Sequence, residues 1–407
     1  MSRSRRKIST VSGIESSELW IDVMWRECLA RHLEDRATEL EERRRSGAKV
    51  VAYLPGGYVP EELVYAAGAI PLCLLEGGSS AAVETGSSIA PTMICPFARA
   101  QLGERVLKRN PYYCHIDMLV APTTCQHLRK VAEIWEYYGE LKIFKLGVPH
   151  QHSGAYQLEY YAAGLNELKE SLERLTGIEI TSERMRAAVD LCNQVRELLK
   201  RLSFMRRSSR AHLSSSDFVR LNHASFYADP AFMLEVLRSI SSELEAKSQE
   251  DRGDRPRLLL ISPNMARGDY RILKLVEESG GEIVMEEVCE GLRDYWHAVE
   301  YRYDFIEALA EAYLKEKLPC AFMRYCARER LEFALRLIRE FNVSGVIWYQ
   351  LQSCETYDSE SYFFSQKFAE RNIPMLVLES DYGDADTSRF RTRIDAFIEL
   401  VRGDAGE

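Results

Sequence analysis

Short apolar runs alternate with segments whose apolar residues recur at helical spacing, and this alternation occurs in two separate stretches of the chain. In the first stretch the apolar runs cover residues 49–54, 69–75, 117–121 and 141–146. In the second stretch they cover residues 257–261, 283–285, 345–351 and 374–378. Strands that alternate with helices in this way form parallel sheets with helices on both faces. The pattern therefore predicts an α/β fold with two parallel-sheet domains.

The remaining segments are predicted to be mostly helical. Residues 1–46 have a loose apolar face followed by a charge-rich half, and residues 154–250 carry long helical patterns before a charged linker. A chain of 407 residues is also too long for one hydrophobic core. We therefore expect an N-terminal helical segment (1–46), a first α/β domain (47–153), a helical middle region with a linker (154–255) and a second α/β domain (256–407). The Gly/Ser-rich stretch Glu76–Ser88 is expected to be a flexible loop.

Charge and hydropathy exclude several classes of protein. The net charge of −9, without a dense basic stripe, gives no reason to expect nucleic-acid binding. The basic residues near the start are not followed by an apolar run, and no uncharged apolar run reaches about 18 residues. We therefore expect a cytoplasmic protein without a membrane span.

Nucleotide-binding motifs are absent from the sequence. It contains no G-x-x-x-x-G-K-[ST] loop and no G-x-G-x-x-G turn after a predicted strand. Any requirement for ATP would therefore come from a partner protein.

Three of the ten cysteines stand at positions that suggest a metal centre. Cys95, Cys125 and Cys354 each follow an apolar run or loop and precede residues that can begin a helix. Strand ends and helix starts meet at one crevice in a doubly wound sheet, so three thiols from distant segments can hold one inorganic group, such as an iron–sulfur cluster. Helix N-termini are expected to lower the thiol pKa, and three ligands leave one coordination position open. The alternative for each thiol is an inert position in the core.

The other cysteines are less informative, because the sequence contains no C-x-x-C pair and the chain does not resemble a small disulfide scaffold. Cys28, Cys73 and Cys192 lie in apolar patterns and are expected in the core. Cys114 and Cys326 are also assigned to the core.

Four side chains are candidates for proton transfer or metal binding. Glu62, at the start of a helix that follows Pro60, could act as an acid/base or could satisfy the helix dipole, whereas Glu61 is expected to be solvated. His127 could donate to the bound group, although packing within its loop is the simpler interpretation. His150 and His152 form a pair, but no neighbouring cysteine or carboxylate completes a zinc ligand set.

Six sequence blocks, in order, resemble the 2-hydroxyacyl-CoA dehydratase / benzoyl-CoA reductase family. The first runs from Gly57 to Pro71 (GYVPEELVYAAGAIP) and the second is Cys95–Arg99 (CPFAR). The others are Asp117…Thr124-Cys125, Cys289–Arg293 (CEGLR), Gly345-Val346-Ile347…Cys354, and Glu379–Tyr382 (ESDY) with Thr392–Phe397 (TRIDAF). Together the blocks span roughly residues 48–400, nearly the whole chain.

The resemblance implies two flavodoxin-like domains with helical additions and a [4Fe–4S] cluster bound by Cys95, Cys125 and Cys354. One iron would remain open to water, hydroxide or substrate. The substrate would be a CoA thioester, either a 2-hydroxyacyl-CoA that is dehydrated through a ketyl radical or an aromatic acyl-CoA that is reduced. The expected partners are a related second subunit or a second copy of the chain, and an ATP-hydrolysing iron–sulfur activator that supplies single electrons.

Three alternatives remain open. A related branch of the family binds a double cubane with extra cysteines, but this chain has Gly57 and Asn110 at two of those positions. Cys289 and Cys320 are further cysteines, and they keep open the alternative of a double-cubane reductase of small molecules. The chain could instead be a non-catalytic subunit that relays electrons or supports assembly, or a metal-free interaction protein.

Overall fold

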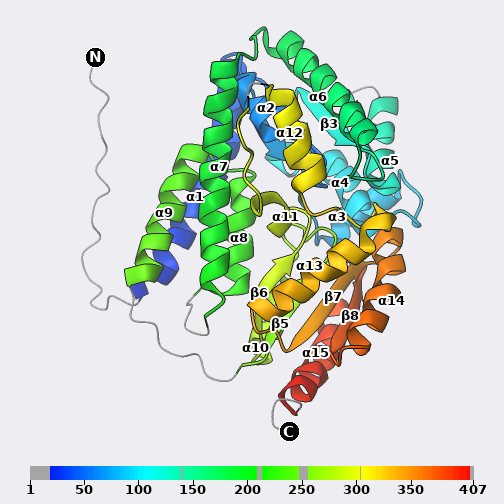
Figure 1. Ribbon diagram of the computed structural model, residues 1–407. Coiled ribbons are helices and arrows are strands. Elements are labelled where there is room, and N and C mark those ends of the chain that lie inside the picture. Colours follow the sequence, from blue (N-terminus) through cyan, green and yellow to red (C-terminus); the bar gives the residue numbers. More distant parts are fainter. Residues whose placement is uncertain (1–18, 139–140, 209–212, 247–254, 303, 404–407) are drawn as a thin grey trace.

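The computed structural model describes residues 19–138, 141–208, 213–246, 255–302 and 304–403 (Figure 1). Within these ranges the first segment is helix α1 (Leu19–Arg45). The first part of the predicted N-terminal helical segment and most of the predicted linker lie outside the described residues.

The first half of the chain forms one parallel sheet. Its strands are β1 (Val50–Tyr53), β2 (Ile70–Cys73), β3 (Met118–Pro122) and β4 (Lys142–Leu146). They pair in the order β2-β1-β3-β4. All residues of β1, β2 and β3 are buried, as expected for strands covered on both faces, whereas the edge strand β4 is partly exposed.

The second half repeats this arrangement. Its strands are β5 (Arg257–Ile261), β6 (Glu282–Glu287), β7 (Gly345–Leu351) and β8 (Met375–Ser380). They pair in the order β6-β5-β7-β8, and every pair is parallel. The prediction of an α/β fold with two parallel sheets is confirmed. In both sheets the chain reverses its winding direction between the two central strands, which is where ligands bind in doubly wound folds.

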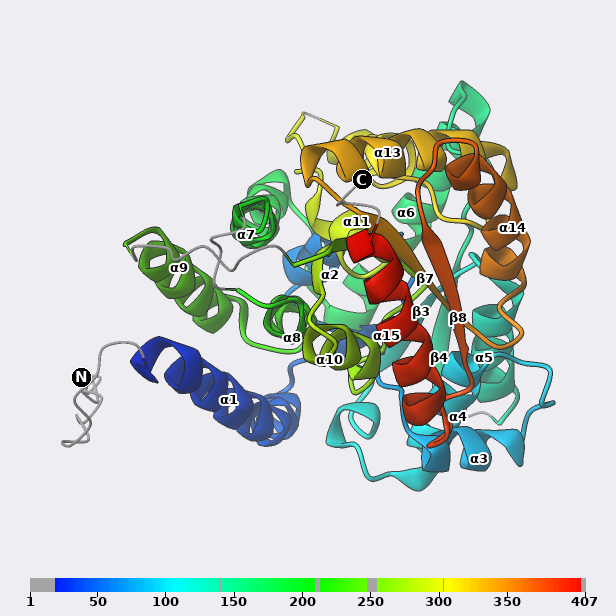
Figure 2. The same cartoon turned by 90° about the horizontal axis from the view of Figure 1, so that it is seen from below.

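Helices cover the sheets and build the middle of the chain. Those of the first half are α2 (Glu61–Ala66), α3 (Ser80–Ser87), α4 (Pro96–Leu107) and α5 (Gln126–Tyr137), with a short turn η1 (Pro111–Tyr113). Those of the middle region are α6 (Ala155–Thr176), α7 (Ser182–Met205), α8 (Ser215–Ser225) and α9 (Pro230–Ala246). Helices α7 and α9 lie side by side, and α1 runs next to α9 (Figures 1 and 2).

The second half contains the remaining helices. These are α10 (Arg271–Glu278), α11 (Leu292–Tyr295), α12 (Phe305–Ala310), α13 (Ala327–Glu340), α14 (Glu355–Ala369) and α15 (Asp386–Gly403). A π-helical segment, η2 (Glu311–Glu316), continues α12, and a short turn, η3 (Arg324–Cys326), precedes α13.

The expectation of a flexible loop over Glu76–Ser88 is wrong, because residues 80–87 form helix α3. The Ser79 side chain caps it by accepting a hydrogen bond from the backbone N–H of Ala82. Gly86 and Gly103 let α3 approach α4 closely, since a Cβ on either glycine would lie 1.9 Å from a backbone oxygen of the other helix. Gly86, one of the glycines that suggested a loop, is therefore a contact residue, and together with Gly103 it lets α3 pack on the helix that begins just after Cys95.

We expect Gly103→Ala to lower the free energy of unfolding by about 2–3 kcal/mol, because the added Cβ forces α3 and α4 apart. The clash would be with the carbonyl oxygen of Ala82, which is backbone and cannot turn aside. Urea unfolding measures the change. Gly403→Ala is the control, since nothing lies within 4 Å of its added Cβ. Equal stability of the two variants would contradict the assigned contact.

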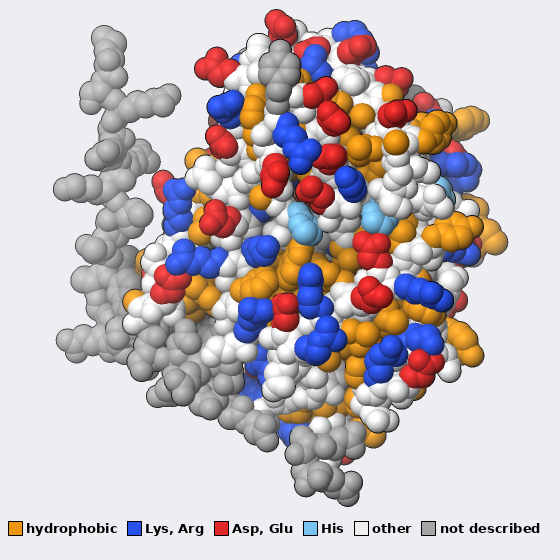
Figure 3. All heavy atoms as spheres, viewed as in Figure 1, with side chains coloured by type: hydrophobic (Ala, Val, Ile, Leu, Met, Phe, Trp, Pro, Cys, Tyr) orange, Lys and Arg blue, Asp and Glu red, His pale blue; other side chains and the backbone are white. Residues whose placement is uncertain are grey.

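On the face shown in Figure 3, Lys and Arg side chains are interspersed with Asp and Glu rather than gathered in one basic area. Among the described helices, none combines the length and apolar character needed to cross a bilayer.

Candidate metal centre

A cavity lies where the carboxyl ends of the central strands of both sheets meet, and we call it the cysteine pocket. Its empty space is about 540 Å³ when the open solvent at its mouth is counted, and about 60 Å³ of it admits the centre of a water-sized sphere. Its wall includes Pro55 and Gly56 after β1, Thr124 after β3, Pro263 and Asn264 after β5, and Leu351 at the end of β7. Phe97, Leu128, Phe322, Thr356 and Tyr357 complete the non-cysteine lining. Both reversal points of the fold therefore contribute to one site.

The three cysteines predicted to bind metal all line this pocket. Cys95 immediately precedes α4, Cys125 precedes α5 and Cys354 precedes α14. The backbone N–H of Leu128, in the first turn of α5, points at the Cys125 sulfur at 3.4 Å. Segments up to 259 residues apart (354 minus 95) thus deliver thiols to one place.

Backbone N–H groups at the helix N-termini lower the pKa of these thiols as expected, but in the metal-free protein burial has the larger and opposite effect. Burial raises the pKa of Cys125 to about 12, and it also raises the pKa of Cys354. Burial and the nearby Cys354 and Cys125 raise the pKa of Cys95. The backbone N–H groups of Ala98 and Phe97 act in the opposite direction but have a smaller effect. The three thiols are therefore protonated at neutral pH until a metal replaces their protons.

Two further cysteines, Cys289 and Cys320, line the same pocket. Their sulfur atoms are 3.7 Å apart, and Arg293 Nη1 donates to Cys289 Sγ at 3.0 Å. The pKa of Cys320 is lowered to about 5, because the Cys289 thiol donates a hydrogen bond to it and because Arg293 and Arg330 are nearby. The pocket therefore holds five sulfur atoms, two of them in a hydrogen-bonded pair next to Arg293.

A buried ionic network supports this cysteine pair. Arg293 donates to Glu287 through Nε at 2.8 Å and to the Tyr357 hydroxyl at 2.7 Å. Arg330 contacts Glu287 at 3.2 Å and also pairs with Glu360, whose pKa is raised to about 7 by burial. Two guanidinium groups beside the pocket favour anionic contents.

Glu290 is a further candidate proton donor, although the sequence pattern around it did not indicate this role. Its Oε1 accepts a hydrogen bond from the backbone N–H of Gly56, and its Oε2 is buried without a protein partner. Burial raises the pKa of Glu290 to about 8, so the carboxyl group is mostly protonated at neutral pH. Its place within the CEGLR block, directly after Cys289, was the available signal.

Glu62 is not among the residues that line the cysteine pocket. Its side chain is fully buried, and its Oε1 pairs with Arg196 Nη1 at 2.5 Å. Its Oε2 accepts a hydrogen bond from the Tyr313 hydroxyl at 2.8 Å. Both carboxylate oxygens are thus occupied by protein groups, and the geometry favours a packing role over an acid/base role.

His127 contacts the loop that carries Cys95. Its Nδ1 lies 3.3 Å from the backbone N–H of Cys95, and burial lowers the pKa of His127. A neutral ring that accepts this hydrogen bond ties the Cys95 loop to the start of α5. The structure thus supports the simpler interpretation, packing within the loop.

Two assignments of other side chains need correction. Cys28 was expected in the core and Cys114 was assigned to it, but both are exposed, whereas Cys73, Cys192 and Cys326 are buried as predicted. The sequence suggested no cysteine or carboxylate beside His152, but the fold places Cys326 and Glu329 there.

Comparison with known proteins identifies the family. The family model for the D-component of 2-hydroxyglutaryl-CoA dehydratase matches residues 57–401. The chain belongs to this family, in agreement with the resemblance of its sequence blocks.

Several relatives align over most of their length. A protein of Escherichia coli (strain K12) is named as dehydratase subunit YjiM. It is 27% identical to this chain over 84% of this chain and 89% of the relative's own length. A benzoyl-CoA reductase subunit from Thauera aromatica is 24% identical over 87% of this chain and 91% of its own. The beta subunit of (R)-2-hydroxyglutaryl-CoA dehydratase from Acidaminococcus fermentans is 23% identical over 89% of this chain and 95% of its own.

Proposed function

We propose that this chain is the iron–sulfur subunit of an enzyme that acts on a CoA thioester by low-potential one-electron chemistry. Cys95, Cys125 and Cys354 would hold a [4Fe–4S] cluster. The observation that supports the proposal most directly is their convergence on one pocket from three separate loops. Family membership supports the substrate class, because two of the relatives described above are named as subunits of benzoyl-CoA reductase and of (R)-2-hydroxyglutaryl-CoA dehydratase.

The residues of the pocket fit such a group. Three thiols provide thiolate ligands and leave one coordination position for water, hydroxide or substrate. When bound, the cluster supplies one-electron transfer at low potential. Arg293 and Arg330 favour its negative charge, and the apolar wall of Phe97, Leu128 and Phe322 limits access of water to the reacting groups. Glu290 does not line the pocket itself, but it holds a proton next to Gly56 and Cys289, which do.

Either of two reactions is compatible with the proposal, namely dehydration of a 2-hydroxyacyl-CoA or reduction of an aromatic acyl-CoA. The relatives include subunits named for each type of enzyme. No phosphate-binding loop occurs in the sequence, so we assign ATP hydrolysis and electron delivery to a separate iron–sulfur activator.

We also propose that the chain works with a related second subunit or with a second copy of itself, since several relatives are named as subunits. Helices α5 and α14, each of which follows a pocket cysteine, lie on the same side of the molecule (Figures 1 and 2). Their N-termini are joined by a hydrogen bond from Gln126 to Glu355 at 2.5 Å. Tyrosines are typical of protein interfaces, and exposed ones lie on or directly after these helices, namely Tyr137, Tyr138 and Tyr362.

A second candidate function is a double-cubane reductase or an electron-relay subunit. The specific observation in its favour is the Cys289–Cys320 pair, which places two extra sulfur ligands in the same pocket. Either cysteine could complete a fourth ligand on one cluster or help to hold a second cluster.

Metal content separates these candidates. The chain would be purified without oxygen, and iron and sulfide would be measured in the wild type and in the Cys289→Ser/Cys320→Ser variant. A single open cluster gives about four iron atoms in both proteins, whereas a double cubane gives about eight in the wild type and fewer in the variant. Turnover of an acyl-CoA with partner subunit and activator would then support the catalytic role, and cluster reduction without any acyl-CoA binding would favour the relay.

We expect metal binding to the three thiols to strengthen as the pH rises. Their pKa values are raised, so each thiol must lose a proton on binding, and the affinity grows by up to about tenfold per pH unit for each proton released. Cadmium titrations of the metal-free protein between about pH 6 and pH 8, followed by thiolate–cadmium absorption, measure the slope. Cys95→Ser should reduce the slope by about one proton. A slope near zero in the wild type would contradict the raised pKa values.

A further inference from the structure

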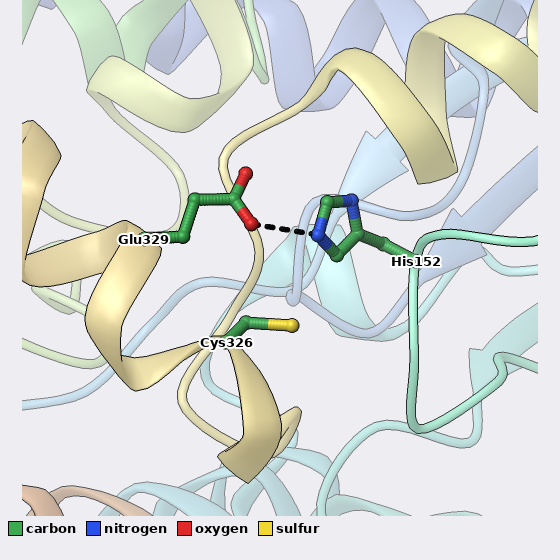
Figure 4. Close-up of side chains that lie close together, drawn as sticks. All are labelled: His152, Cys326 and Glu329. Carbon is green, nitrogen blue, oxygen red and sulfur yellow. Dashed lines mark hydrogen bonds and ion pairs between the residues drawn. The ribbon is translucent and has the colours of Figure 1, made fainter.

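A second group of possible metal ligands lies outside the cysteine pocket. It consists of His152, Cys326 and Glu329, whose ligand atoms all lie within 4.8 Å of one another. His152 belongs to the segment between β4 and α6, Cys326 ends η3, and Glu329 lies in the first turn of α13. Figure 4 shows the three side chains converging from these two parts of the chain. None of the three lines the cysteine pocket.

Each nitrogen of the His152 ring lies next to an oxygen atom. Its Nδ1 lies 3.3 Å from the carbonyl oxygen of Lys315, and its Nε2 lies 2.8 Å from Glu329 Oε2. Both neighbours are hydrogen-bond acceptors, but a neutral imidazole has only one N–H group. If Nδ1 donates to the carbonyl, either a second proton or a metal ion must lie between Nε2 and the carboxylate.

The thiol of Cys326 distinguishes these two possibilities. A protonated histidine paired with a carboxylate has no need of a third donor, whereas zinc binds nitrogen, sulfur and oxygen together. Cys326 is buried, and its sulfur accepts a hydrogen bond from the backbone N–H of His152, so it faces the histidine. The carbonyl of Lys315 also fixes the ring in the way that carbonyl groups orient metal-binding histidines.

We propose that His152 Nε2, Cys326 Sγ and a carboxylate oxygen of Glu329 bind one zinc ion, with water in the fourth position. Around tetrahedral zinc, neighbouring ligand atoms lie roughly 3.3–3.7 Å apart. The Glu329 oxygen therefore has to move away from His152 by roughly half an ångström to one ångström. This is easy, because the Glu329 side chain is 52% exposed and, among the described residues, its ion-pair partner is His152 alone.

The proposed ion joins the two α/β halves at the rim of the cysteine pocket. It links the segment after β4, in the first half, to the start of α13, in the second. The same segment carries His150, whose ring packs edge-on against Phe322 of the pocket wall with 5.4 Å between ring centroids. The proposed ion would therefore connect the two halves, and it does not depend on the function proposed for the pocket.

Metal analysis of the full-length, cluster-loaded protein tests this site. After incubation with Zn²⁺ and removal of loosely bound metal, the wild type should retain about one zinc per chain in addition to its iron. His152→Ala and Cys326→Ser should lose that zinc and keep their iron. The matched controls are His150→Ala, the neighbouring histidine, and Glu332→Gln, an exposed carboxylate one turn further along α13, and both should keep the zinc.

Cobalt provides a second measurement that identifies the sulfur ligand. Co²⁺ bound to the cluster-loaded wild type, in which the pocket thiols are already occupied, should add thiolate charge-transfer absorption, which Cys326→Ser abolishes and Cys114→Ser preserves. Glu329→Gln, a surface change that leaves the fold intact, should weaken binding of both metals. The proposal is overturned if the wild type holds no zinc, or if zinc and the cobalt absorption persist in Cys326→Ser and His152→Ala.

Discussion

Replacing Cys95 with serine is expected to lower the iron content from about four atoms per chain to less than one. The serine hydroxyl remains protonated at neutral pH and is a poor ligand for iron, so the cluster would keep only two of its three attachments. Because the cluster is lost, turnover of an acyl-CoA by this variant should fall to the background rate. Iron and sulfide analysis after anaerobic purification measures the first effect, and assays with partner subunit and activator measure the second.

Cys114→Ser is the matched control, because this cysteine is exposed and does not line the cysteine pocket. It should retain full iron. Normal iron in Cys95→Ser would mean that the cluster, if present, is bound elsewhere, and it would remove the basis of the proposed function. Iron loss in both variants would instead indicate a general sensitivity to substitution.

Replacing Arg196 with methionine is expected to lower the free energy of unfolding by about 3–5 kcal/mol. Glu62 is fully buried and pairs with Arg196 at 2.5 Å. The variant would therefore leave a buried carboxylate without its ion-pair partner. Urea unfolding measures the loss. Arg174→Met, which breaks an exposed pair with Glu170 on α6, should change stability by less than about 0.5 kcal/mol.

A substitution of Glu62 itself tests whether this residue has a packing role or an acid/base role. If the carboxylate serves packing, Glu62→Gln should lower stability, keep its iron and retain turnover in proportion to the folded fraction. Unchanged stability together with lost turnover would instead restore the acid/base role that its place at the start of α2 suggested. The Arg196→Met/Glu62→Leu variant should recover part of the lost stability, because it removes both buried charges.

Local patterns in the sequence determined the class of fold. The apolar runs predicted the positions of β1, β3, β5 and β7 to within about two residues. Strands that are buried on both faces appear in the sequence as continuous runs of hydrophobic residues. The cysteines that precede α4, α5 and α14 could also be recognised from the sequence. The ends of strands and the starts of helices depend on patterns of only a few residues. Six ordered blocks then indicated the family, which the match over residues 57–401 confirms.

Tertiary structure decided what depends on distance and burial. The helix at Ser80–Ser87 packs closely on α4 because Gly86 faces the backbone of Arg99 and Gly103 faces that of Ala82, and no local pattern encodes those contacts. The raised thiol pKa values follow from the depth of the pocket, which outweighs the helix N-termini. Glu62 is held by Arg196 and Tyr313, which lie 134 and 251 residues away in the chain.

The two sulfur-containing sites illustrate the same division. The sequence by itself selected Cys95, Cys125 and Cys354, because each stands where a strand or loop gives way to a helix. It could not bring Cys289 to Cys320, or His152 to Cys326 and Glu329, because these side chains meet only after both sheets and their connecting segments have packed. Spacing along the chain constrains the neighbours of a residue over a few positions, whereas longer-range proximity is set by the packing of the whole molecule.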